Sequence, residues 1–114
     1  MMNSWASGPQ LSCQVFTQGK DHHLFFSTTS QPYLGQPIDF ERFRFKAIVS
    51  KGDGQMEYIK ISVSYRSGPE AIILQQATYL PPFIHGNSLT GRQQLYSPDY
   101  GREFIYDCGL AGIP

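Results

Sequence analysis

Apolar and polar residues alternate with a period of two through most of this 114-residue chain, and this alternation constrains the fold more than any other feature. The clearest stretch is 43–49, where Phe, Phe, Ala and Val occupy the odd positions while Arg44 and Lys46 occupy even ones. Successive side chains of a strand point to opposite faces of a sheet, so this pattern predicts a strand with one face in the core.

Two more strands are predicted directly after it. Residues 51–54 (Lys-Gly-Asp-Gly) suit a hairpin turn, because Gly and Asp tolerate positive φ. The returning strand is predicted to turn Ile59, Ile61, Val63 and Tyr65 inward, and Tyr58, Lys60, Ser62, Ser64 and Arg66 outward. A second tight turn at 67–70 leads into a strand over 71–80, with one face formed by Ile72, Leu74, Gln76 and Thr78. These three strands predict an antiparallel meander.

The flanking regions complete an all-β prediction. Strands are expected over 11–16, 22–28 and 104–110, and the Pro- and Gly-rich connection 30–37 is expected to hold no regular element. Pro81-Pro82 ends the third meander strand, since neither residue can donate a ladder hydrogen bond. The chain is therefore predicted to be one antiparallel β-sandwich or small β-barrel of six to eight strands over 11–114. It has a flexible segment at 1–10 and a long loop near 83–101, with a short strand at 93–96.

Composition excludes several classes of protein. Aromatic residues make up 14% of the chain, which supplies enough large apolar surface to exclude disorder. No uninterrupted apolar stretch reaches the roughly 18 residues of a membrane helix, so membrane insertion is not expected. Nine basic residues balance nine acidic ones, and this gives no overall field that would attract a nucleic acid.

The two cysteines, Cys13 and Cys108, lie near opposite ends of the chain and both fall on the apolar phase of their predicted strands. If the first and last strands are neighbours, the pair forms a disulfide that stabilises the fold by about 4–5 kcal/mol. A disulfide predicts a periplasmic or secreted protein. The alternative is two buried free thiols in a cytosolic protein.

No metal, cofactor or catalytic set is predicted. The adjacent His22 and His23 would point to opposite faces of their strand and could not share an ion. The one combination suited to nucleophilic catalysis, Ser88 with His85 and Asp99, lies in the long loop without a Gly-x-Ser-x-Gly elbow. The chain is therefore not expected to be an enzyme.

Five basic residues are predicted to share the solvent face of two neighbouring strands: Arg42, Arg44, Lys46, Lys60 and Arg66. The charges of this basic face have two possible roles. They are solvated charges that prevent edge-to-edge aggregation, or they form a patch that steers a protein partner. A platform for single-stranded nucleic acid is less consistent with it, because only Tyr58 accompanies the charges.

The 83–101 loop is the predicted partner-binding element, because long loops without regular structure are usually functional and because Tyr and Arg are enriched at binding hot spots. The alternative is a loop held against its own sandwich by its aromatic residues. The candidate contacts are His85, Asn87, Ser88, Arg92, Tyr96, Asp99 and Tyr100.

In general format the chain resembles the small extracytoplasmic inhibitors of peptidoglycan hydrolases, among them the β-barrel lysozyme inhibitors. These bridge cysteines near both ends and present a polar loop containing Ser, Gly and Tyr, to which residues 88–91 (Ser-Leu-Thr-Gly) and Tyr96 are similar. The Gly-to-Tyr spacing differs, so no functional residue is carried over.

The resemblance implies an extracytoplasmic protein-binding domain, an inhibitor or immunity protein that blocks a bacterial cell-wall hydrolase or toxin by loop insertion. One alternative is a small-ligand or carbohydrate-binding β-domain that uses Trp5 or a Tyr as a stacking surface. Another is an assembly subunit of a secretion or surface structure, joined through an exposed strand edge.

Overall fold

The computed structural model of the chain describes residues 10–29, 37–52, 55–83, 88–99 and 101–111, and within them the fold is all-β without helices. The first four strands are β1 (Gln10–Thr17), β2 (Lys20–Thr29), β3 (Ile38–Phe40) and β4 (Phe43–Gly52). The other four are β5 (Gln55–Ser67), β6 (Glu70–Tyr79), β7 (Gln93–Tyr96) and β8 (Glu103–Ala111).

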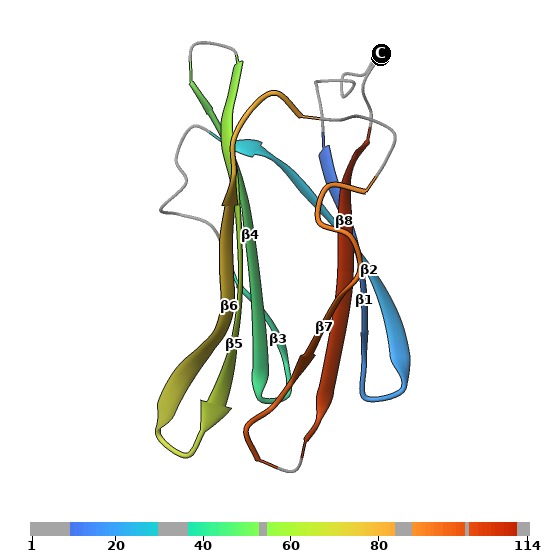
Figure 1. The fold of residues 1–114 in the computed structure, drawn as a ribbon, viewed down its shortest axis with the longest axis vertical. Helices are drawn as coiled ribbons and strands as arrows, with labels where there is room; N and C mark the ends of the chain where they lie inside the picture. Colours follow the sequence, from blue (N-terminus) through green and yellow to red (C-terminus); the bar gives the residue numbers. More distant parts are fainter. Residues whose placement is uncertain (1–9, 30–36, 53–54, 84–87, 100, 112–114) are drawn as a thin grey trace.

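The strands form two facing layers, as Figure 1 shows. We call β2, β1, β8 and β7, in that order, sheet A, and β3 to β6 sheet B. The end of β2 crosses to sheet B and pairs in parallel with β4 at Thr28–Val49 and Thr29–Ser50. At the opposite edges, Gln75 Nε2 of β6 donates to Gln93 Oε1 of β7 at 2.9 Å. The sandwich is thus a nearly closed barrel.

The inward phases of β1, β4, β5 and β8 form the core, which confirms the predicted alternation in these strands. Sixteen buried residues make one cluster between the sheets. Phe104 of β8 packs against the rings of Phe43 and Phe45 across the layers, with centroids 5.1 and 5.9 Å apart. Aromatic contacts of this geometry add to the hydrophobic stabilisation of the core. The inward-facing core residues of β1, β4, β5 and β8 are Leu11, Cys13, Val15, Phe43, Phe45, Ala47, Val49, Ile59, Ile61, Val63, Tyr65, Phe104, Tyr106, Cys108 and Leu110.

Tight turns set the register of the hairpins. Thr17 pairs with Lys20, so Gln18 and Gly19 form a two-residue turn in which both have positive φ, of 56° and 75°. The predicted turn at 67–70 is also present, with Gly68 at a φ of 68° between the paired Ser67 and Glu70. Two-residue turns with positive φ match the twist of the strands they join.

The prediction that one face of β6 carries residues 72, 74, 76 and 78 is wrong. The pairing with β5 shifts between Val63 and Ser64, which leaves Leu74 as an extra residue opposite them. Beyond this bulge the phase reverses, so Gln76 and Thr78 are exposed, while residues 75, 77 and 79 are half-buried. A bulge adds one residue to one strand, and a pattern read from sequence alone does not reveal that shift.

Two further features were not expected from the sequence. The short strand β3 pairs with the start of β4 immediately after the predicted irregular connection. The parallel contact between β2 and β4 departs from a wholly antiparallel sheet. The predicted short strand at 93–96 is confirmed as β7.

The predicted disulfide is present. Cys13 and Cys108 lie directly opposite each other on β1 and β8, their sulfur atoms are 2.08 Å apart, and both side chains are fully buried. The disulfide is consistent with an oxidising compartment. The described residues include no helix that could span a membrane.

Removing the disulfide should destabilise the fold strongly. In Cys13→Ala/Cys108→Ala the free energy of unfolding, measured by urea denaturation, should fall by about 4–5 kcal/mol, because the unfolded chain regains the entropy of a loop of roughly 100 residues. A reducing agent should lower the stability of the wild type but not that of the variant. Equal midpoints for the variant and the oxidised wild type would contradict this expectation.

Candidate functional site

The described part of the predicted binding loop lies along β8 rather than standing away from the sandwich. Ser88 forms a bridge with Gly109, and Leu89 N donates to Cys108 O at 2.8 Å. β7 then pairs with β8 from Tyr106 to Glu103. The segment from 88 to 96 therefore lies along β8 from Gly109 to Glu103.

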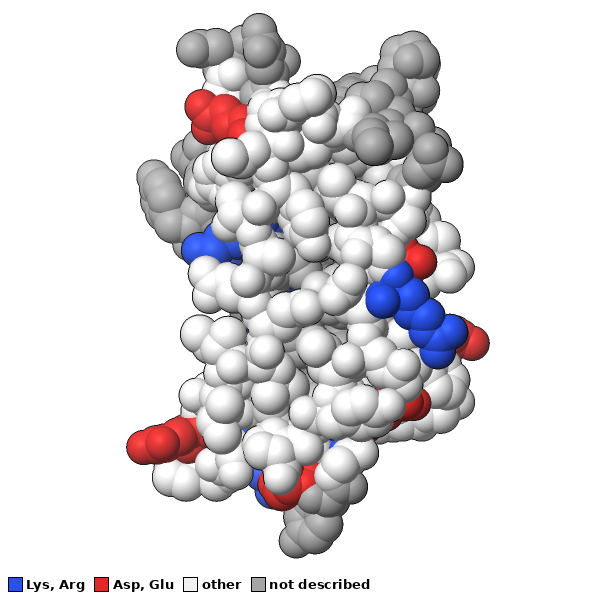
Figure 2. Space-filling model, in the orientation of Figure 1, with Lys and Arg blue, Asp and Glu red and all other residues white. Residues whose placement is uncertain are grey.

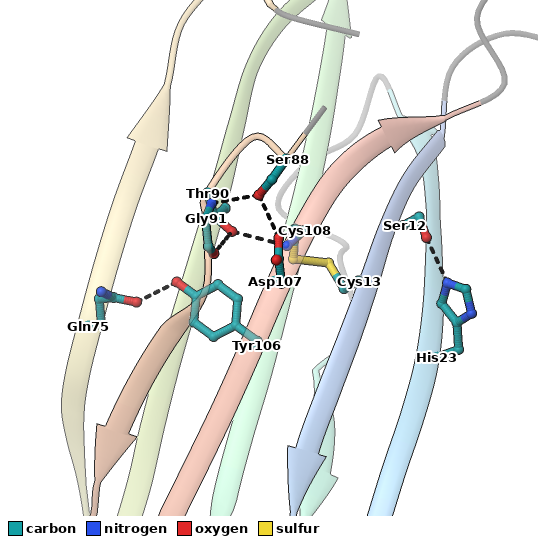
Figure 3. Close-up of a disulfide and its surroundings, with 10 residues drawn as sticks. All are labelled: Ser12, Cys13, His23, Gln75, Ser88, Thr90, Gly91, Tyr106, Asp107 and Cys108. Carbon is teal, nitrogen blue, oxygen red and sulfur yellow. Dashed lines mark hydrogen bonds between the residues drawn. A yellow bond between two sulfur atoms is a disulfide. The ribbon is translucent and has the colours of Figure 1, made fainter. Parts of the chain in front are cut away.

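Two hydroxyl groups hold this segment in place (Figure 3). Thr90 Oγ1 accepts from Cys108 N at 3.0 Å and donates to Gly91 O at 2.7 Å. Ser88 Oγ donates to Asp107 Oδ1 at 2.5 Å and accepts from Gly91 N at 2.7 Å. Each hydroxyl both donates and accepts, so the segment has a fixed shape beside the disulfide.

Replacing Thr90 by Val tests this attachment. The variant keeps the shape of the side chain but leaves Cys108 N without an acceptor, so the free energy of unfolding should fall by about 1–2 kcal/mol. Hydrogen exchange of the Cys108 amide should become faster. Thr78→Val on the exposed phase of β6 is the matched control and should change neither quantity. Unchanged exchange at Cys108 would show that Thr90 does not hold the segment.

The outer face of sheet A exposes three large aromatic side chains, although the solvent-facing positions of a strand are usually polar. Phe16 is 37% exposed, Tyr96 is 56% exposed and Phe25 is 59% exposed. The ring of His23 stacks on Phe25 with centroids 4.5 Å apart. From β2 to β7, the outward-facing residues of this face are Asp21, His23, Phe25, Ser12, Gln14, Phe16, Glu103, Ile105, Asp107, Gln94 and Tyr96.

A groove of about 500 Å³ crosses this face. Ile105, only 9% exposed, lies between Phe16 of β1 and Gln94 of β7 in the cross-strand register. Tyr96 lies next to the groove, where Gln94 Nε2 donates to Tyr96 Oη at 2.8 Å and to Glu103 Oε2 at 2.7 Å. We call Phe16, Tyr96, Ile105 and the polar residues Gln14, Asp21, Arg92, Glu103 and Asp107 the sheet A groove.

The sheet A groove has an excess of negative charge. Asp21, Glu103 and Asp107 line it with one cation, Arg92. No carboxylate lies within salt-bridge distance of the Arg92 guanidinium among the described residues. Figure 2 shows a contrasting side of the molecule, over the seam between β6 and β7, where charged side chains are few and lie at the margins.

A Ser–His pair lies on this face without a carboxylate hydrogen bonded to it among the described residues. Ser12 Oγ and His23 Nε2 are 2.7 Å apart on neighbouring strands (Figure 3). Nucleophilic catalysis needs a carboxylate that orients the imidazole. Among the described residues no carboxylate is hydrogen bonded to His23, whose ring packs on Phe25 instead. His22 points the other way and packs on Phe40 at 4.7 Å, so the two histidines do face opposite sides as predicted.

The structure places three of the predicted contact residues on one face, although Ser88 and Tyr96 lie at opposite ends of it, beside Gly109 and Glu103. Ser88, Arg92 and Tyr96 all lie at the outer face of sheet A. Ser88 and Asp99 lie at opposite ends of β8, about 20 Å apart along the strand. The predicted contacts His85, Asn87 and Tyr100 lie outside the described residues, as does Trp5.

Asp99 lies in a hydrogen-bonded turn between β7 and β8. Ser97 N donates to Arg102 O at 2.8 Å, and Ser97 Oγ donates to Asp99 O. Burial raises the pKa of Tyr65, and the neighbouring Asp99 carboxylate raises it further because a negative charge disfavours the phenolate. The place of Asp99 in this hydrogen-bonded turn favours a structural role there rather than a role in partner binding.

The predicted basic face lies on the outer side of sheet B. Lys46 and Lys60 are half-buried on β4 and β5, and Arg44 and Arg66 are exposed. Arg42 lies in the two-residue turn between β3 and β4 rather than on a strand. Arg44 holds Asp39 with two hydrogen bonds of 2.7 and 3.2 Å. This hydrogen-bonded guanidinium keeps the pKa of Asp39 below its ordinary value.

Replacing Arg44 by Gln should raise the pKa of Asp39 toward its ordinary value, because the variant loses both the charge and the bidentate hydrogen bonds. Carboxyl NMR during a pH titration measures the change. In the wild type, any stabilisation from the pair is present at neutral pH and is lost as the pH falls through the lowered pKa of Asp39. Arg102→Gln is the control. Arg102 forms a salt bridge with Glu41 and not with Asp39, so the pKa of Asp39 should be unchanged in this variant. An unaltered pKa in Arg44→Gln would contradict the interpretation.

Sequence reasoning missed the aromatic part of the sheet A groove, although a signal was present. Phe16 and Ile105 fall on the phase of β1 and β8 that is otherwise polar, as Phe25 does on β2. A large apolar residue on the solvent phase of a strand indicates either a covering element or a binding surface.

Comparisons with known proteins assign no family. No protein-family model matches the chain, and no curated protein or solved structure matches it. Among the described residues, no three His, Cys, Asp or Glu side chains gather closely enough to hold a metal ion.

Proposed function

We propose that the protein is an extracytoplasmic, non-catalytic protein-binding domain that docks through the outer face of sheet A. The observation that carries this proposal is the exposure of Phe16, Phe25 and Tyr96 on the solvent phase of strands whose other phase forms the core. Aromatic residues and Arg are enriched at protein interfaces, because they offer a large contact area with a polar end.

The shape of this face supports docking as a rigid body. The disulfide joins β1 to β8, and the hydroxyl groups of Ser88 and Thr90 tie the next segment to β8. A surface ordered before binding loses little conformational entropy in the complex. Docking of this kind replaces the predicted loop insertion, because the described part of the loop is bonded to the sheet.

The charge of the sheet A groove indicates the chemistry of the partner. Three carboxylates and one guanidinium line it, which favours a protein with a basic surface patch. We infer that the partner is a cell-wall hydrolase or toxin, blocked when the face covers its substrate cleft. The protein would then be a periplasmic or secreted inhibitor or immunity protein.

The test measures whether the protein inhibits any of a panel of basic peptidoglycan hydrolases. Hydrolase activity is measured as the rate at which a cell-wall suspension loses turbidity. Wild type should inhibit at least one of them, and Tyr96→Ala should weaken inhibition by about tenfold or more, because hot-spot aromatic residues contribute at this level. Ile73→Ala is the matched control, since Ile73 is 64% exposed on β6 outside this face.

An envelope extract extends the search beyond the panel, with captured proteins identified and their affinities measured. The proposal fails if no partner binds more tightly than about 10 µM. It also fails if Tyr96→Ala and Ile73→Ala reduce binding to the same extent.

A carbohydrate-binding domain is the second candidate, and one observation favours it. The sheet A groove, at about 500 Å³, lies within the range of small-ligand sites and combines the exposed Phe16 ring with Gln14 and Asp21 as partners for hydroxyl groups. This function would be favoured over the first if the protein binds a neutral oligosaccharide, if Phe16→Ala abolishes that binding, and if no protein partner is found.

A further inference from the structure

A second groove lies on the outer side of sheet B, where the turn between β3 and β4 meets the hairpin between β5 and β6. It has a volume of about 670 Å³, larger than the sheet A groove. We call it the sheet B groove; its polar lining comprises Arg42, Arg44, Ser64, Arg66, Asp39 and Glu41.

The carboxylates of this groove are already neutralised. Asp39 accepts both hydrogen bonds of Arg44. Glu41 Oε1 lies 3.3 Å from Arg102 Nη1, a cation of the hairpin between β7 and β8. Two guanidinium groups, those of Arg42 and Arg66, are left without a carboxylate in salt-bridge contact among the described residues.

The backbone holds these two arginines side by side. Arg66 N donates to Arg42 O at 2.8 Å, and Arg42 Nη1 donates to Arg66 O at 3.1 Å. The charge of Arg66 also contributes to the lowered pKa of Asp39, so the Arg66 guanidinium lies near the Arg44–Asp39 pair. Two neighbouring arginines without a carboxylate in salt-bridge contact among the described residues, beside an Asp39 that already accepts both hydrogen bonds of Arg44, favour binding of an anion.

The geometry of the donors indicates the kind of anion. Each guanidinium offers a planar fork that binds two oxygen atoms, and Ser64, opposite Arg44 in the register, adds a hydroxyl group. A carboxylate has only two oxygens and would satisfy one fork. A sulfate ester or phosphate monoester presents three terminal oxygens, and the two non-bridging oxygens of a phosphodiester diverge tetrahedrally, so each of these groups can be shared between Arg42 and Arg66.

The cations also continue away from the groove. Lys46 follows Arg44 by two residues on β4, about 7 Å along the strand, and Lys60 lies beyond it on β5. A row of cations at such intervals suits a linear polymer with repeated anionic groups. Tyr58 is the one aromatic residue among the outward residues of β5, and it is half-buried, so the face offers no platform for stacked nucleic-acid bases.

We propose that the sheet B groove binds a phosphate or sulfate group of a linear anionic polymer of sugar or polyol units. Arg42 and Arg66 hold the oxyanion, Asp39 orients Arg44 at its edge, and Lys46 and Lys60 follow the polymer along the sheet. This site is independent of the protein-binding face, which lies on the opposite layer. An extracytoplasmic protein would use it to remain at a polyanionic surface.

The test measures fluorescence anisotropy of a labelled, sulfated heparin-derived oligosaccharide at about 50 and 150 mM NaCl. Poly(glycerol phosphate) and inorganic phosphate serve as competitors, and they separate polymer-borne sulfate, polymer-borne phosphate and free phosphate as sources of the anion. We expect one of the two polymers to bind with a Kd of about 1–100 µM, more weakly at the higher salt.

Three variants distinguish a specific anion site from non-specific electrostatic attraction of the polymer. Arg42→Ala/Arg66→Ala should weaken binding at least about tenfold, whereas Lys20→Ala/Lys51→Ala, with the same change in net charge at exposed positions elsewhere, should stay within about twofold. Arg66→Lys keeps the charge but loses the fork, and should weaken binding by about threefold or more. Melting temperatures confirm that all variants are folded.

The proposal is overturned if neither polymer binds at the lower salt, or if the Lys20 and Lys51 variant loses as much affinity as the arginine variant. It is also overturned if Arg66→Lys binds as tightly as wild type. Tighter binding of a labelled single-stranded DNA than of either polymer would assign the groove to nucleic acid instead. None of these outcomes bears on partner binding by sheet A.

Discussion

The pairing of β1 with β8 is the interaction on which the remainder of the molecule depends. It joins the first and last described strands, and the disulfide lies at its centre, with Cys13 directly opposite Cys108. Without this pairing, sheet A would consist of two separate hairpins, β1–β2 and β7–β8, neither of which buries enough apolar surface to be stable alone. The covalent bond therefore stabilises the layer that carries the proposed protein-binding face.

The same strand also explains why a long polar connection has a fixed shape. β8 offers hydrogen-bonding groups on both of its edges; β1 occupies one edge, and residues 88–96 occupy the other. Cys108 contributes to both sides, through the disulfide and through its backbone contacts with Leu89 and Thr90. The loop consequently follows the sheet, and Arg92 and Tyr96 become part of a face instead of a projecting tip.

Much of this architecture could be predicted from the sequence, because alternation and turn chemistry are local properties. The inward residues of β4 and β5 and the turn at Gly68 were predictable in this way, and the apolar phase of both cysteines favoured the disulfide over two free thiols. The reversal of phase in β6 and the crossing of β2 to β4 were not, since both depend on pairing between distant strands. The groove beside Phe16 was missed for a related reason: its members come from β1, β2, β7 and β8, and only the sheet brings them together.

The two outer faces show how a chain with no net charge can still carry strong local electrostatics. Alternation sends the ionised residues of both sheets outward, and the strand order then leaves an excess of opposite sign on each layer. Carboxylates exceed cations on sheet A, whereas on sheet B Asp39 and Glu41 are paired and Arg42 and Arg66 are left over. Fields of opposite sign on opposite layers permit two binding events at once, since charges separated by more than a Debye length of about 8–10 Å hardly affect each other. Strand order, rather than overall composition, is therefore what determines the electrostatic character of each face.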